Sequence, residues 1–104
     1  MLPRLLLLAV CLAGLGAEPG RAADVEQGKV IAERWCSSCH LVQPGQKTAV
    51  PDQAPPFMTI AKTPDFDAGE LALRLLAPHP NMPKLALSRS EVADLAAYIR
   101  TLPH

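Results

Sequence analysis

The sequence is poor in aromatic residues and shows no strand pattern. Only four of its 104 residues are aromatic, namely one Trp, one Tyr and two Phe. Such a chain builds a thin core by itself, so a disulfide or a bound cofactor is expected to supplement that core. No segment alternates apolar and polar residues as a half-buried strand does, and no repeat occurs. Basic and acidic residues balance at ten each, which gives no indication of nucleic-acid binding.

The N-terminal segment, residues 1–22, is predicted to be a cleaved signal peptide. Arg4 precedes an uncharged apolar run over residues 5–16, which is short for a membrane span and leads into small residues. We place cleavage after Ala22, because Gly20 and Ala22 supply small residues at the two positions that signal peptidases require. Two other cleavage positions fit, after Ala17 and after Ala23. An uncleaved N-terminal anchor is the alternative interpretation.

Removal of this segment leaves a single domain over residues 23–104, with eight basic and nine acidic residues. Cys11 lies within the apolar run and is discarded with it. The sequence therefore predicts a periplasmic protein with no stable membrane insertion after cleavage. Export also makes a disulfide or a covalent cofactor plausible.

Helix-start patterns recur along the mature chain. Three N-cap residues are each followed three positions later by Gln or Glu: Asp24 and Gln27, Asp67 and Glu70, Ser88 and Glu91. They predict helices that end near Trp35, before Pro78 and before Pro103, and Pro56 begins a shorter helix. The fold class is therefore all-α, with three to four short helices. The long loops between them are expected to wrap something.

One motif carries the chemistry. Cys36-Ser37-Ser38-Cys39-His40 has the C-x-x-C-H spacing of covalent haem attachment. On a helical turn these positions share one face, so both thiols can bond to one porphyrin while His40 binds the iron. The motif predicts one haem c, held through two thioethers from Cys36 and Cys39.

Three other kinds of site use cysteines at such a spacing. A zinc site requires four ligands, and no second cysteine pair is present to complete one. A thioredoxin-like redox pair belongs in a βαβ pattern, which this chain lacks. A Cys36–Cys39 disulfide would close only a very small loop and would stabilise little.

Met82 is the predicted sixth ligand of the iron. It lies between two predicted helices, and Pro80 and Pro83 stiffen its loop. Three other side chains carry a suitable donor atom: Met58, His79 and His104. Met58 is expected to pack in a short helix, and His104 is terminal. Ligation by His79 would give a lower reduction potential than ligation by Met82.

Taken together, the features from Asp24 to Leu102 resemble the class I cytochrome c family. The resemblance implies a cytochrome c fold wrapped around one haem, in which the first and last helices cross closely at Gly28 and Tyr98. It also implies that a backbone carbonyl accepts the Nδ1–H of His40. Pro55 is the best match for that carbonyl, and Pro44 is the alternative.

The function expected from these residues is single-electron transfer by Fe(III)/Fe(II) cycling, without catalysis. A six-coordinate iron bound by His40 and Met82 offers substrates no open position. The chain would be a diffusible carrier between redox protein partners or a redox subunit of a larger periplasmic oxidoreductase. The alternative is a haem-based enzyme or gas sensor with an open distal iron.

Further expectations concern the side chains around the haem and at the protein surface. Apolar helix faces should exclude water from the haem, with contributions from Trp35, Phe57 and the leucines of 71–76. Four basic residues are candidates for the rim of a docking face: Lys47, Lys62, Lys84 and Arg89. Docking is expected to be weak and fast, over a small interface.

Overall fold

Four helices form the regular structure of the residues that the computed structural model describes, which are 22–47, 54–77 and 82–104. In chain order they are α1 (Val25–Trp35), α2 (Phe57–Ile60), α3 (Ala68–Leu76) and α4 (Arg89–Thr101). No strand occurs within these ranges, so the predicted all-α class is confirmed. Among the same residues, no helix is both long and apolar enough to cross a membrane.

The predicted helix starts are those of the structure. The carboxylates of Asp24 and Asp67 accept hydrogen bonds from the N–H groups of Gln27 and Glu70, at 3.0 and 2.9 Å. At α4 both halves of the capping box form, since the Ser88 hydroxyl accepts from the Glu91 N–H and the Glu91 carboxylate accepts from the Ser88 N–H. These bonds satisfy donors that each helix start would otherwise leave unpaired.

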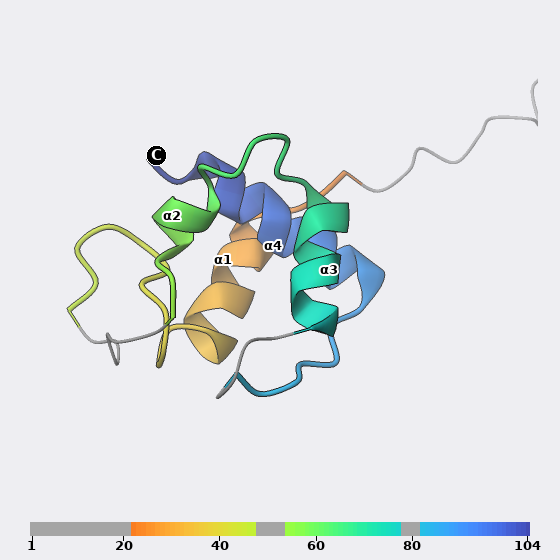
Figure 1. Ribbon diagram of the computed structural model, residues 1–104, viewed down its shortest axis with the longest axis horizontal. Coiled ribbons are helices and arrows are strands. Elements are labelled where there is room, and N and C mark those ends of the chain that lie inside the picture. The colour runs from red at the N-terminus through yellow and green to blue at the C-terminus, as the bar shows by residue number, and fades with distance from the viewer. Residues whose placement is uncertain (1–21, 48–53, 78–81) are drawn as a thin grey trace, which may run out of the picture.

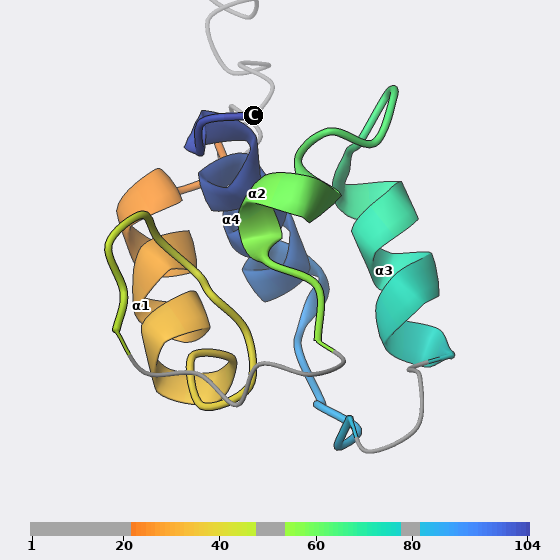
Figure 2. The same ribbon diagram turned by 60° about the vertical axis from the view of Figure 1, so that its left-hand side comes forward.

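Helix α4 is the centre of the fold and contacts each of the other three helices. α1 and α4 lie against each other, while α3 stands on the other side of α4 and the short α2 lies across it (Figures 1 and 2). Its buried side chains, including Leu95 and Ile99, supply the middle of the apolar core. The segment after Met82 returns along the base of the fold into α4 (Figure 2).

The crossing of α1 and α4 depends on Gly28. A Cβ atom at this position would clash with the carbonyl oxygen of Asp94 and would lie 2.6 Å from its carbonyl carbon and 2.8 Å from Cβ of Tyr98. Only glycine allows the two backbones to approach so closely. The predicted meeting of Gly28 and Tyr98 is thus present, and it accounts for a residue that weakens an isolated helix.

Candidate haem site

An apolar cavity of about 220 Å³ opens between α2, α3, α4 and the Cys-x-x-Cys-His segment. Its walls combine three predicted site residues with side chains from all of these elements: Cys36, His40, Pro55, Phe57, Ile60, Leu71, Arg74, Leu75, Ala77, Met82, Leu95 and Ile99. The fold thus gathers Cys36, His40 and Met82, which are up to 46 positions apart in the chain, around one space. Cys39 is not among the lining residues.

The attachment segment continues the end of α1 as a tight turn. The N–H groups of Cys39 and His40 both donate to the carbonyl of Cys36, at 3.2 and 2.8 Å. Cys36 is buried, whereas Cys39 is exposed, with its Sγ 3.8 Å from the hydroxyl of Ser38. Burial, with a smaller contribution from Cys39, raises the pKa of the Cys36 thiol to about 11. The Cys36 thiol is therefore protonated at neutral pH.

His40 is fixed by a backbone carbonyl. Its Nδ1 lies 2.7 Å from the carbonyl oxygen of Pro55, and the residue as a whole is only 6% exposed. A carbonyl can only accept, so Nδ1 carries the proton and Nε2 holds the lone pair that binds a metal. The ring of Phe57 lies 5.3 Å from the imidazole, centroid to centroid. Of the two candidate carbonyls, the structure therefore selects Pro55.

Gln46 holds the segment that follows the motif, a role that the sequence did not indicate. Its Nε2 donates to the carbonyls of Ser37 and His40, both at 3.0 Å, and its Oε1 accepts from the N–H of Val42. The hydroxyl of Tyr98 donates to the carbonyl of Val42 at 2.7 Å. Together these bonds connect the attachment turn to α4. A single glutamine in a polar loop carries no signal from which this could have been predicted.

Met82 is the methionine that lies at the cavity. It is half-buried and lines the same space as His40. Met58 is not among the lining residues and packs, partly buried, against the core. His79 lies outside the described residues, and His104 contacts the carbonyl of Leu102 near the C-terminus. Of these two methionines, the structure therefore brings Met82 to the space that His40 lines.

The expectations about water exclusion hold in part, since Phe57 lines the cavity and Trp35 does not. Trp35, the last residue of α1, is 54% exposed. The leucines of α3 divide between two faces: Leu71 and Leu75 line the cavity, while Leu73 and Leu76 are exposed. Because an α-helix has 3.6 residues per turn, Leu71 and Leu75 share one face, while Leu73 and Leu76 point away from it.

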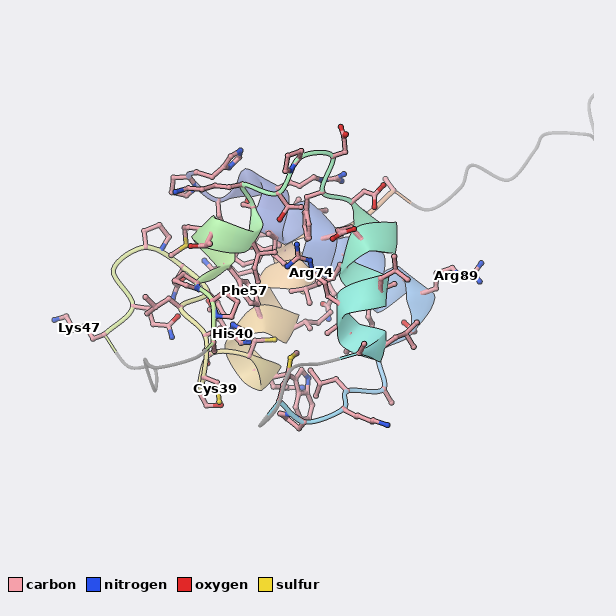
Figure 3. The ribbon with its side chains drawn as sticks, viewed as in Figure 1. Cys39, His40, Lys47, Phe57, Arg74 and Arg89 are labelled. Atoms are coloured by element: carbon pink, nitrogen blue, oxygen red, sulfur yellow. The ribbon has the colours of Figure 1, made fainter. Side chains whose placement is uncertain are left out.

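The charged groups near the site include one residue that lines the cavity itself. Lys47 and Arg89 project from the left and right edges of the molecule in the view of Figure 3. Arg74 is the charged residue among those lining the cavity, and it was not predicted. Its guanidinium donates to the carboxylate of Glu70 at 3.2 Å and to the hydroxyl of Thr63 at 3.0 Å. Figure 3 shows His40 and Phe57 together on one side of the opening and Arg74 nearer α3.

The residues present fit a haem. An imidazole with its Nδ1–H already engaged, a thiol and a thioether face one largely apolar space, and these are the donors that c-type haem uses. The zinc alternative receives no support, since the described residues contain no cluster of three or more His, Cys, Asp or Glu side chains. Cys36 and Cys39 are free thiols. Cys36, Cys39, His40 and Met82 are therefore the residues that could hold a haem.

Comparisons with known proteins agree with this geometry. The family model for cytochrome c matches residues 25–103. A protein of Bradyrhizobium diazoefficiens named cytochrome c-552 is 51% identical over 81 residues, which cover 78% of this chain and 77% of that protein. No solved structure gives a significant match. The chain belongs to the cytochrome c family, as a small class I c-type cytochrome.

Proposed function

We propose that this chain is a periplasmic monohaem cytochrome that carries single electrons between protein partners. Cys36 and Cys39 would hold the porphyrin, and His40 and Met82 would bind its iron. The observation that carries this proposal is the convergence of Cys36, His40 and Met82 on one apolar cavity. The family membership supports covalent haem and electron transfer in general.

The residues of the chain divide the work in a definite way. When bound, the haem supplies the Fe(III)/Fe(II) couple. His40 is held in one tautomer by the Pro55 carbonyl, which increases the basicity of Nε2. Met82 lines the same cavity and would supply the second protein ligand, which would leave no open position for a substrate. Leu71, Leu75 and other apolar lining residues exclude water.

Absorption spectra of the periplasmically matured protein test the ligand set. We expect sharp α and β bands in the reduced protein and, in the oxidised protein, the weak far-red band of an iron–methionine bond. Met82→Ala should abolish that band and open the iron to CO, while the matched variants Met58→Ala and His79→Ala should leave it. A wild-type spectrum that is high-spin and binds CO would instead support the enzyme or sensor alternative.

The attachment residues are tested by haem staining after denaturing electrophoresis, because only covalent haem stays with the chain. Loss of both thiols in Cys36→Ala/Cys39→Ala should abolish staining. Each single variant should retain one thioether and stain more weakly. Full staining of the double variant would contradict the proposed attachment.

Periplasmic location follows from the proposed leader, residues 1–22, of which 1–21 lie outside the described residues. Cell fractionation tests the location, and the mass of the mature protein tests the cleavage. An uncleaved chain would contradict the proposed removal of the leader. Docking is proposed at the cavity opening, where Lys84 is exposed two residues from Met82. Co-purification with a larger enzyme would distinguish a permanent subunit from a free carrier.

A further inference from the structure

Asp94 is a carboxylate enclosed in the packed interface between α1 and α4. It is 2% exposed and does not line the haem cavity, so electron transfer does not account for it. Its Oδ1 accepts the backbone N–H of Asp24 at 2.8 Å. Asp24 is the N-cap of α1, so Asp94 contacts the point where the folded domain begins. A carboxylate enclosed in this way favours a cation beside it.

Removal of the leader would create a cation at this point. Hydrolysis of the Ala22–Ala23 bond leaves a carboxylate on Ala22 and an amine on Ala23, which takes up a proton at neutral pH. Ala23 Nα is three covalent bonds from the nitrogen of Asp24, or at most about 4 Å away. Since that nitrogen already contacts Asp94, the new ammonium forms within reach of the Asp94 carboxylate.

We propose that Asp94 is the binding site for the α-ammonium group that processing creates at Ala23. This inference rests on the proposed removal of the leader. The ion pair fastens the first residue of the mature chain to α4 and offsets the unfavourable position of a cation beside the N-terminus of α1. Cleavage after Ala23 would satisfy the same site, since Asp24 N itself would become the ammonium. Cleavage after Ala17 would not, because five further residues would separate the ammonium from Asp24.

An NMR titration of the reduced, haem-loaded mature protein tests the pairing. The methyl and Cα signals of Ala23 in ¹³C-alanine-labelled protein report the protonation of its α-amino group, whose ordinary pKa is about 8. We expect a midpoint at least about one unit higher, a tenfold tighter hold on the proton. Asp94→Asn should return it to the ordinary range. The control Glu26→Gln removes an exposed carboxylate from the first turn of α1 and should leave the midpoint nearly unchanged.

A second comparison keeps Asp94 in place, in case Asp94→Asn does not fold. In Ala23→Gln the mature N-terminal glutamine can be cyclised to pyroglutamate, which removes the positive charge without lengthening the chain. Cyclisation should lower the Tm of this protein by several degrees. An equal Tm before and after cyclisation would overturn the pairing.

The remaining outcomes also decide the question. An ordinary midpoint at Ala23, unaffected by Asp94→Asn, would overturn the proposal, as would a mature N-terminus other than residue 23 or 24 by mass. If Asp24 proves to be the first residue, the raised midpoint should appear in its own signals. The haem spectrum of the same sample tests the electron-carrier function separately. A failure of the Asp94 pairing can therefore be distinguished from a failure of the proposed function.

Discussion

The Nδ1 atom of His40 lies 2.7 Å from the carbonyl oxygen of Pro55, 15 positions further along the chain. This bond fixes the ring orientation and makes the imidazole a stronger donor to ferric iron. Pro55→Gly keeps the carbonyl but frees its backbone. Weakening the bond should raise the reduction potential by up to about 40 mV, if about 1 kcal/mol of hydrogen bonding is lost. Potentiometry checks this, with Pro44→Gly as the control that should leave the potential unchanged.

Gly28→Ala should destabilise the protein by about 3 kcal/mol, because the new Cβ overlaps the Asp94 carbonyl and forces α1 away from α4. Urea unfolding measures the change in the free energy of unfolding. Gly69→Ala is the matched control, since its Cβ would come no nearer than 3.3 Å to the Asp67 carboxylate. There alanine should be neutral or stabilising by up to about 1 kcal/mol. Similar losses at both glycines would contradict the close crossing.

Tyr98→Phe removes the hydroxyl that donates to the Val42 carbonyl. It should lower the free energy of unfolding by about 1–3 kcal/mol. Burial, with smaller contributions from Glu33 and Glu26, raises the pKa of Tyr98 above its ordinary value of 10.0. The folded state therefore holds this proton more tightly than the unfolded state, so stability should fall as the pH rises above about 10.

Unfolding curves recorded from pH 9 to 11 test the role of Tyr98, and the alkaline fall in stability should be smaller in Tyr98→Phe. If stability falls equally in Tyr98→Phe, the alkaline loss of stability comes from other groups.

Gln46→Leu should loosen the attachment turn, since three hydrogen bonds to the backbone of Ser37, His40 and Val42 disappear together. We expect the free energy of unfolding to fall by about 2 kcal/mol and hydrogen exchange at the Val42 amide to become faster. Gln43→Leu alters the same loop without these bonds and serves as the control. Unchanged exchange at Val42 in Gln46→Leu would show that the loop is held by other contacts.

Arg74→Met removes the positive charge from the cavity wall and should lower the reduction potential, because a nearby cation favours the ferrous state. A Coulomb interaction of roughly 0.5–1 kcal/mol corresponds to about 20–40 mV. The control Arg89→Met, which removes a side chain that projects from the edge of the molecule in Figure 3, should change the potential much less. Equal shifts in both variants would point to net charge alone.

The sequence by itself determined the helices and the chemistry of the motif. Caps such as Ser88 and Glu91 act through hydrogen bonds three residues apart, so local order suffices to predict them. The spacing of Cys36, Cys39 and His40 is likewise a property of one helical turn. Periodicity also marked the apolar face of α4, from Val92 to Ile99.

Only the tertiary structure decided how distant segments meet. It distinguished Pro55 from Pro44, showed Trp35 on the surface, and brought Arg74 and Gln46 to the site. None of these follows from local pattern, because each depends on where α3 and the loops pack against α4. Asp94 shows the same limit most clearly: its partner at Asp24 lies 70 positions away, and only the crossing at Gly28 brings the two together.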